Sequence, residues 1–577
     1  MRKITLLISI LTLSWAPVLW AQQSGAGVLG SNVKLYTLQG NMSVQTHAYS
    51  TTRANSFRDP LGMLATMNLN YSLLGFRSGM SFRYSTDNSQ LRQSMNQISF
   101  RAGYRWVDVA AGDVSPTFNK YSLRGMNIKG AEVQVNTAWL GLHAVGGRVN
   151  KRIDALDGRP IRGLAYERWL YAGRMRLGRD AGSHVAMGVV YSRDDDAELL
   201  PPDIQSTGPN RVPVPEENLT ISPDFRFFMF SRRVEFKGEN TVSVFTRDIR
   251  SESLDVSEAG VPEFFTRIYT PRTSTRVNFA TSLSTRLNFR PVTVNLGYDR
   301  VQPGFRSLGL RNVRDDDQNF SIQPQVALMQ GRLNLSSSVR FGRDNLLNQR
   351  TSTQYRNDVS LNAQKQISER LALGAGYSIL INRAVTSSNV DADEALNYPE
   401  QVVVSQTFNL QPSYNWTVSN ASHSISLSGN YQSLTIDIDN IDRDLNSTFF
   451  TTTASYNLSY FSGLNINTGV NYASGNSASN EFNVIGFNTG IGYAFFNRKV
   501  NVNLTGGMTQ NSSESYFSGA SQRQAQRQIN GNFTAMYRPI RSNTIRFTAR
   551  TVSNSFIEGA GMGFNELEVR LTIDQRF

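Results

Sequence analysis

The segment LGMLATMNLNYSL, residues Leu61–Leu73, is followed by a Leu74-Gly75 pair and then by FRSGMSFRYS, residues Phe76–Ser85. In the first segment apolar residues share one parity, and Thr66, Asn68, Asn70 and Ser72 share the other. In the second, Phe76, Met80, Phe82 and Tyr84 oppose Arg77, Ser81, Arg83 and Ser85. A period of two predicts β-strands with one apolar and one polar face. The Gly between them predicts a tight hairpin turn.

The same alternation recurs along the rest of the chain, for example in 97–105, 277–288 and 500–504. A soluble β-sandwich also alternates, so the alternation alone does not decide the class. Two further features favour a membrane barrel. The alternation continues from near residue 34 to residue 577, and many strands exceed ten residues, whereas soluble strands usually have about 5–6.

The connections between these strands switch between short and long. Short turns are predicted at sites such as Leu74-Gly75, Gln330-Gly331 and Asn497-Arg498. Examples of the long polar segments are 193–223, 251–273, 302–317 and 384–399. Outer-membrane barrels have short periplasmic turns and long external loops. With a turn at Arg105-Trp106 and a separate strand over Val107–Asp113, we expect one closed antiparallel transmembrane β-barrel of about 26 strands (24–26).

The composition agrees with a barrel. Charged residues make up 18% of the 577 residues, below the ~25% of soluble domains. The mean hydropathy of −0.34 would suggest a soluble chain, but lipid-facing and water-facing residues cancel in a barrel. There is no Cys, which excludes disulfides and thiol chemistry. The net charge of +13 comes from scattered Arg rather than a patch, so we expect no nucleic-acid partner.

The N-terminus has the features of an export signal. Arg2 and Lys3 precede a mostly apolar run, Ile4–Leu13, and Ala21 offers a small residue for cleavage. An uncleaved anchor helix is the alternative, but the run is shorter than the ~20 residues that a span needs. We therefore expect a signal peptide at 1–21, a short segment at 22–33 with no folded plug, and the barrel at 34–577.

The last strand is the most specific single signal. Leu567, Val569, Leu571, Ile573 and Phe577 share one parity, and the chain stops on Phe577. This ending resembles the C-terminal signature by which bacterial outer-membrane barrels are recognised for insertion. The resemblance implies the outer membrane as location, the barrel-assembly machinery as partner for insertion, and lipid and lipopolysaccharide as surroundings.

Charged residues on the polar parity are candidates for the lining of a pore. A charge on the lipid face costs roughly 2–4 kcal/mol at the membrane midplane, so these side chains should point inward. Rings of Arg in a pore favour anions, although pairing with inward acids would only brace the wall. The pore-lining candidates are Arg77, Arg83, Arg101, Arg105, Arg286, Glu566, Glu568 and Arg570.

The stretch 298–309 looks neither strand-like nor like a charged loop. Its Pro-Gly pair marks a turn, and Phe305 and Leu308 are apolar residues in a predicted loop. A constriction folded into the lumen explains them, and an ordinary packed loop explains them equally well. The constriction candidates are Tyr298, Arg300, Pro303, Gly304 and Phe305. Loops 193–223 and 251–273 are also expected to fold inward.

The sequence predicts no metal site, no cofactor and no enzymatic activity. The four His residues are scattered, and no nucleophile or phosphate-loop motif is present. Acidic clusters in the external loops offer oxygen ligands for Ca²⁺, although solvated loop charge is the simpler interpretation. These clusters are 194–198, 315–317, 391–394 and 437–444.

Several segments resemble those of large, mostly uncharacterised Gram-negative outer-membrane β-barrel proteins. They are YDRVQPGFRSLG at 298–309, Gly112-Asp113 followed by YSLRG at 121–125, and Arg343-Asp344-Asn345. The resemblance implies an outer-membrane barrel with no assigned substrate. We expect a passive or loop-gated, porin-like channel for small polar or anionic solutes. The alternatives are a structural or secretion-assembly barrel whose lumen holds a partner protein and, third, a hydrolase in the barrel wall.

Overall fold

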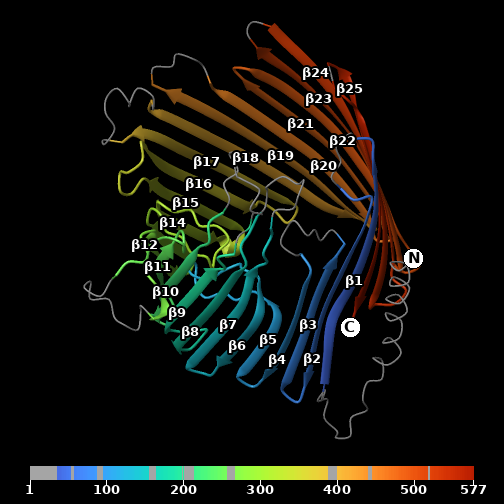
Figure 1. Ribbon diagram of the computed structural model, residues 1–577. Helices are drawn as coiled ribbons and strands as arrows, with labels where there is room; N and C mark the ends of the chain where they lie inside the picture. The colour runs from blue at the N-terminus through green and yellow to red at the C-terminus, as the bar shows by residue number, and fades with distance from the viewer. Residues whose placement is uncertain are drawn as a thin grey trace.

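The computed structural model describes residues 36–53, 58–86, 95–154, 164–197, 199, 213–255, 267–387, 399–439, 445–517, 520–559 and 561–577. Over these ranges the chain forms 26 antiparallel strands in one sheet (Figure 1). The predicted signal peptide and the 22–33 segment lie outside the described residues.

The strand bounds are β1 (Tyr36–Thr51), β2 (Leu61–Leu73), β3 (Phe76–Ser85), β4 (Gln97–Tyr104), β5 (Val107–Val114), β6 (Ile128–Asn136), β7 (Leu140–Asn150), β8 (Arg168–Gly178), β9 (His184–Asp194), β10 (Glu217–Met229), β11 (Val234–Thr246), β12 (Thr275–Phe289), β13 (Val292–Val301), β14 (Asp317–Leu328), β15 (Leu333–Asp344), β16 (Ser352–Gln366), β17 (Leu371–Thr386), β18 (Gln401–Val418), β19 (Ala421–Ile438), β20 (Ser447–Tyr460), β21 (Leu464–Ser477), β22 (Asn480–Phe495), β23 (Val500–Phe517), β24 (Ala520–Tyr537), β25 (Asn543–Glu558) and β26 (Phe564–Arg576).

The sheet closes on itself. Each strand pairs with the next, and β1 pairs with β26 from Asn41–Arg576 to Thr51–Glu566. The backbone N–H of Phe577 also donates to the carbonyl of Gly40 at 2.9 Å. Closure satisfies the backbone groups that an edge strand would leave open, which is what allows a sheet to cross a membrane. The predicted barrel of about 26 strands is confirmed.

The predicted connections are confirmed in part. β5 is a separate strand after the turn at Arg105, whose φ is 52°. The predicted loop 193–223 extends too far, because β10 already begins at Glu217. The tight turn over 230–233, with positive φ at Phe230, Ser231 and Arg232, was not predicted. The strict short–long order is wrong near the C-terminal end, where β21 and β22 are joined by only two residues on the long-loop side.

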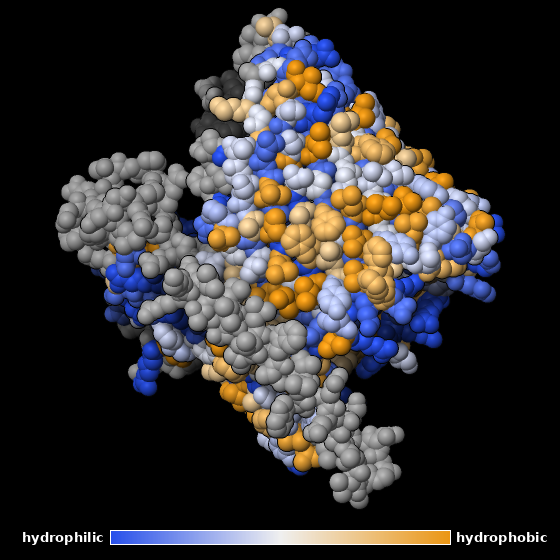
Figure 2. Space-filling model, turned by 90° about the vertical axis from the view of Figure 1, so that its right-hand side faces the viewer, coloured by the Kyte–Doolittle hydropathy of each residue, from blue (hydrophilic) through white to orange (hydrophobic). Residues whose placement is uncertain are grey.

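The outer surface carries the apolar parity of the strands. Figure 2 shows apolar side chains gathered in a band over the strands on one face. Exposed aromatic residues stand at the short turns, among them Trp106, Trp139, Phe230, Phe461 and Phe496. Such aromatic girdles mark the interfaces of membrane barrels. Among the described residues, no helix has the length and apolar character to cross a bilayer.

The wall of the barrel is uneven in height. β4 and β5 have 8 residues each, whereas β18, β19, β23 and β24 have 18. At about 3.3 Å per residue, this is the difference between roughly 26 and 60 Å of strand. In β23 the outward side chains are apolar up to Met508 and then become Gln510, Ser512 and Glu514. β23 therefore continues past its apolar outward residues on the side away from the short turn that precedes it.

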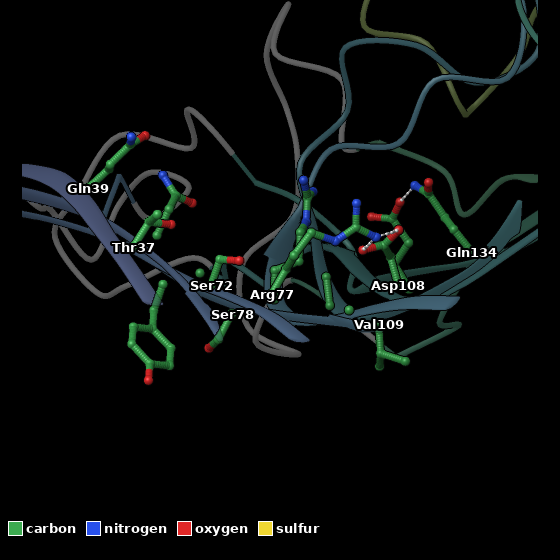
Figure 3. A pocket seen from close by; sticks show the side chains of 15 residues that line it. Thr37, Gln39, Ser72, Arg77, Ser78, Asp108, Val109 and Gln134 are labelled. Carbon is green, nitrogen blue, oxygen red and sulfur yellow. Dashed lines mark hydrogen bonds and ion pairs between the residues drawn. The ribbon is translucent and has the colours of Figure 1, made fainter. Parts of the chain in front are cut away.

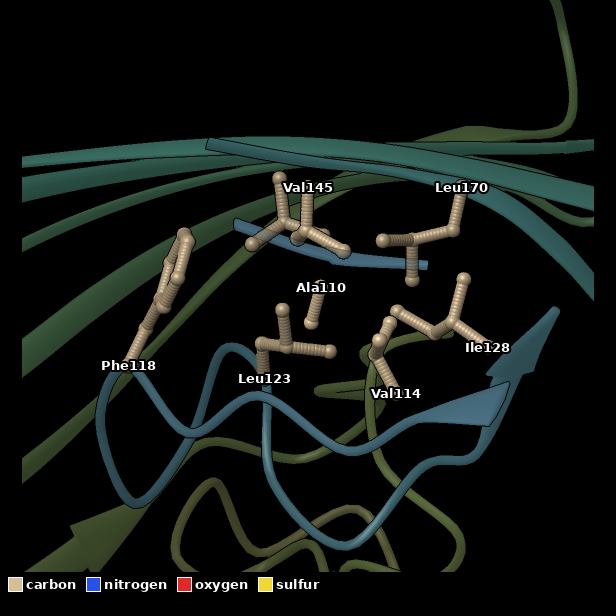
Figure 4. Packing of buried hydrophobic residues seen from close by; sticks show 8 residues of the cluster. Ala110, Val114, Phe118, Leu123, Ile128, Val145 and Leu170 are labelled. Carbon is tan, nitrogen blue, oxygen red and sulfur yellow. The ribbon is translucent and has the colours of Figure 1, made fainter. Parts of the chain in front are cut away.

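The largest buried apolar cluster lies inside the barrel. Ala110, Val145 and Leu170 project from the inner face of neighbouring strands, and Phe118 and Leu123 cover them from the segment between β5 and β6 (Figure 4). Leu123 and Leu170 are 0% exposed. An apolar core on the inner wall indicates that this part of the lumen is filled by chain rather than by water, and it positions the site described next.

Candidate functional site: two inner loops on the lumen wall

The connection between β5 and β6, residues 115–127, is here called the first inner loop. Asn119 organises it: its Oδ1 accepts the backbone N–H groups of Tyr121 at 2.9 Å and Ser122 at 2.8 Å. Its amide donates to Oγ1 of Thr241 on β11 at 3.3 Å. A short amide side chain that bonds nearby backbone is a common way to fix a tight turn. The loop therefore reaches from β5 and β6 across to β11.

Asp299 on β13 holds the next two residues of the first inner loop. Its Oδ1 accepts Nζ of Lys120 at 2.5 Å and the hydroxyl of Tyr121 at 3.2 Å. Burial raises the pKa of Tyr121, and the negative charge of Asp299 raises it further. Tyr121 thus stays a neutral phenol that donates to the carboxylate.

The connection between β13 and β14, residues 302–316, is the second inner loop. Phe305 and Leu308 are each 3% exposed, and Phe305 packs edge-to-face on Tyr121 with ring centroids 6.2 Å apart. The wall holds the loop backbone. Asn278 donates to the carbonyl of Pro303 at 2.8 Å, and Asn218 Oδ1 accepts the N–H of Leu308 at 3.1 Å.

The two inner loops are joined to each other. The N–H of Arg124 donates to the carbonyl of Gly309 at 3.1 Å, within a parallel bridge between Arg124 and Leu310. The hydroxyl of Ser307 donates to the carbonyl of Ser122 at 2.8 Å. A Cβ on Gly309 would collide with that same carbonyl, so glycine is required for the close approach. The loops form one unit.

A third segment supports the second inner loop. Asp316, 2% exposed, accepts the N–H of Leu346 at 2.7 Å and pairs with Arg350 at 2.9 Å. Next to it, the amide of Asn345 donates to Thr353 at 2.9 Å. Of the segments that carried the family resemblance, 121–125 and 298–309 therefore contact each other inside the barrel, and 343–345 lies next to the contact between Asp316 and Leu346.

The acidic cluster 315–317 takes part in this packing. Asp315 accepts the N–H of Gly304 at 2.7 Å, and Asp317 pairs with Arg356. These carboxylates bind backbone amides and guanidinium groups in the structure. Loop-bound Ca²⁺ stays a prediction. Glu198 and the residues 391–394 and 440–444 lie outside the described residues.

The five constriction candidates separate into two groups. Pro303, Gly304 and Phe305 belong to the second inner loop. Tyr298 and Arg300 lie on β13, on the parity opposite to Asp299, and therefore face outward. Their placement in a constriction is wrong, because the alternation of β13 continues to Val301 and the loop begins only after it.

Two of the pore-lining candidates, Arg77 on β3 and Arg101 on β4, line a cavity of about 470 Å³. Arg77 points to Asp108 and pairs with it at 2.9 Å (Figure 3). Arg101 lines the same cavity, and Arg83 shares the inward parity of Arg77. Arg105 lies in the turn after β4, with its guanidinium 5.2 Å from the ring centre of Tyr104, so it is not part of the strand lining.

The other candidates lie on β12 and at the β1–β26 seam. Arg286 shares the parity of Asn278, which contacts the second inner loop, and so faces the lumen. At the seam Glu568 pairs with Arg58 at 2.6 Å and with Arg570 at 2.7 Å. Glu566 pairs with Arg53 at 2.8 Å. The three candidates at the seam, Glu566, Glu568 and Arg570, are therefore each in an ion pair.

The described part of the predicted loop 251–273 does not fold into the lumen. Tyr269, 1% exposed, packs on Leu219 and Val244, whose parity faces outward. Burial raises the pKa of Tyr269 to about 12. The middle of this loop and most of 195–216 lie outside the described residues. The loops that the structure shows folded inward are instead 115–127 and 302–316.

The first inner loop was missed as a constriction. Its sequence carries the same kind of signal that singled out 298–309, because the apolar residues Phe118 and Leu123 follow the predicted strand Val107–Asp113. The partners Asn119, Thr241 and Asp299 were not predictable, because they meet across more than a hundred residues.

No family model matches the chain, and no curated protein matches it. Among solved structures, OccK8 (OprE) of Pseudomonas aeruginosa is similar over 63% of this chain and 92% of its own, with 10% identity and a TM-score of 0.29. The FrpB iron transporter of Neisseria meningitidis is similar over 93% and 81%, with 9% identity and a TM-score of 0.39. The P pilus usher (PapC) translocation pore is similar over 94% and 99%, with 10% identity and a TM-score of 0.25. The closed 26-stranded sheet and its apolar outer band make this chain an outer-membrane β-barrel.

Proposed function

We propose that this barrel is an outer-membrane channel for polar solutes, narrowed by the unit that the two inner loops form. One observation carries the proposal: in the lumen of a 26-stranded barrel, the two loops are docked on the wall and on each other through Ser307–Ser122 and Arg124–Gly309. A barrel of this size is too wide for side chains to fill, so its conductance depends on what folds into it.

Conductance measurements in planar bilayers test the proposal. We expect steady conductance from the wild-type protein and a roughly twofold or larger conductance from Gly309→Val, because the valine side chain separates the inner loops and widens the path. Gly429→Val is the control, since no atom beyond its chain neighbours lies within 4 Å of the position that a Cβ on Gly429 of β19 would take. Absence of conductance in both the wild type and Gly309→Val would contradict a channel function.

The alternative predicted from the sequence is a structural or secretion-assembly barrel with a partner protein in its lumen. It differs from the channel in a measurable way. A stoichiometric partner that co-purifies and whose removal alone produces conductance would favour the alternative. Conductance from a pure single chain would favour the channel.

A further inference from the structure

The inner wall formed by β17 to β24 carries no charged side chain among its described residues. These eight strands lie side by side and include the longest of the barrel (Figure 1). Their charged residues are Arg383, Asp437, Glu481, Glu514, Arg523 and Arg527. Each of these has the parity of the outward side chains; Glu481, for example, shares its parity with Ile485 and Phe487 of β22. We call the inward side of these strands the neutral wall.

The strands on either side of the neutral wall carry charged residues on their inward parity. β16 carries Arg356 and Asp358 on its inward parity, and β25 carries Arg546 and Arg550. On the opposite side of the barrel, inward charges such as Arg174 and Asp224 form pairs. The loss of charge therefore begins and ends at definite strands, and it coincides with the tall part of the barrel.

Part of the surface of the neutral wall consists of amide side chains that lie over glycines. Across β21 and β22, Asn465 faces Gly492, Asn467 faces Gly490 and Asn471 faces Gly486. A Cβ on any of these three glycines would collide with the facing Asn amide.

The same arrangement recurs where Asn409 faces Gly376 and Asn530 faces Gly507. Asn488, Asn503 and Asn530 are exposed to the lumen. An amide carries both donors and an acceptor, so the wall can donate hydrogen bonds to a hydroxyl group and accept them from it.

One aromatic pair stands on the neutral wall near the end of the strands away from the short turns. Phe449 of β20 and Phe482 of β22 flank Gly475 in one cross-strand row, with ring centroids 5.7 Å apart and an interplanar angle of 40°. The row continues to Gln432 on β19 and Ser513 on β23. An apolar ring pair is thus bordered by polar groups.

We propose that the neutral wall binds a neutral polyhydroxylated chain, an oligosaccharide, as it passes through the lumen. Hydroxyl groups exchange their water for the Asn, Gln, Ser and Thr side chains, and Phe449 and Phe482 stack on the apolar face of a sugar ring. A wall without charge gives no preference to an ion, and its many weak sites let a solute both bind and leave. The inference rests on the proposed channel function and names its substrate class.

Interruption of the ion current by sugars tests the inference. We expect maltohexaose to interrupt the wild-type current in proportion to its concentration, and hexagalacturonate of the same length to do so less. In the double variant Phe449→Ala and Phe482→Ala, the binding constant of maltohexaose should fall about tenfold. Phe450→Ala is the matched control, because Phe450 lies next to Phe449 but faces outward, against Tyr472. Its binding constant should be that of the wild type.

The failure of this inference can be told apart from failure of the channel. A conducting wild type whose current maltohexaose does not affect, or affects equally in the double variant, overturns the neutral-wall proposal and leaves the channel intact. A stronger effect of hexagalacturonate also overturns it. When neither the wild type nor Gly309→Val conducts, calorimetric titration of the detergent-solubilised barrel with maltohexaose decides instead: binding lost in the double variant supports the wall, and no binding overturns it.

Discussion

The hydroxyl of Ser307 donates a hydrogen bond of 2.8 Å to the backbone carbonyl of Ser122, 185 residues earlier in the chain. The bond joins two loops that leave the barrel wall at different strands, β5 and β13. It is one of several polar contacts that make the two inner loops a single unit. The first three predictions test that unit, and the other two test the lining and the rejected constriction residues.

A disulfide should lock the inner loops together. Arg124 and Leu310 are bridge partners, and the chain has no native Cys, so the double variant Arg124→Cys and Leu310→Cys contains a single thiol pair. We expect wild-type conductance with fewer fluctuations when oxidised, and the fluctuations to return with reductant. Fluctuations that are the same in both redox states would show that the loops do not separate during gating.

Removing the charge of Asp299 should loosen the first inner loop. Asp299→Asn weakens the bonds to Lys120 and Tyr121, and hydrogen bonds to charged groups contribute about 1.5–3 kcal/mol each. We expect larger current noise and a higher mean conductance. Asp358→Asn on β16 is the control for loss of an inward carboxylate. Equal noise in both variants would count against a specific anchor.

Alkaline pH should release the first inner loop through Tyr121. Its pKa is raised by burial and by Asp299, so the folded loop favours the neutral phenol. This stabilisation is complete below the ordinary pKa of about 10 and is lost as the pH rises through the raised value. Current noise should therefore rise at strongly alkaline pH, and less in Tyr121→Phe. The difference in current noise between the wild type and Tyr121→Phe is the measurement that checks the prediction.

Freeing Arg77 should make the lumen more selective for anions. Arg77 is paired with Asp108, and Asp108→Asn leaves its positive charge without a carboxylate. The reversal potential in a salt gradient should move toward that of chloride, and the additional change Arg77→Ser should cancel the shift. Asp437→Asn, on the outward parity of β19, should leave the reversal potential unchanged. An identical potential in all variants would place Arg77 outside the ion path.

The outward placement of Tyr298 can be compared directly with the inward placement of Phe305. Phe305→Ser removes a buried ring of the second inner loop that packs on Tyr121 of the first. Loss of such a ring lowers the free energy of unfolding by about 3–5 kcal/mol in a typical core, so conductance should change. Tyr298→Ser should leave conductance at the wild-type level. A conductance change in Tyr298→Ser alone would contradict the observed parity of β13.

The sequence predicted the barrel well because the alternation within each strand already shows which residues face lipid and which face the lumen. The alternation in Leu61–Leu73 and Phe76–Ser85 is local, and both strands appear with those bounds. Loop placement is not local. Whether 115–127 or 251–273 folds inward depends on contacts such as Asn119–Thr241 and Tyr269–Leu219, which form only once distant strands are neighbours.

The same difference between local and non-local information explains which parts of the candidate site were predicted. Phe305 was singled out correctly as an unusual apolar residue in a connection, and the structure places it in the second inner loop. Tyr298 and Arg300 were misplaced, because the Pro-Gly turn drew the predicted loop boundary too early. The neutral wall was overlooked, because the absence of charge on one face becomes visible only when eight strands are aligned by register.

The uneven height of the barrel also determines how a large molecule meets it. Strands of 18 residues on one side and of 8 on the other give the barrel an oblique rim that is higher on the side of the long strands. In the proposed channel, a long flexible polymer from outside would meet the inner side of the long strands, where Phe449 and Phe482 lie, before it reaches the inner loops. In such a channel the surface that first binds the polymer is separate from the part narrowed by the inner loops, so binding and passage become separate events.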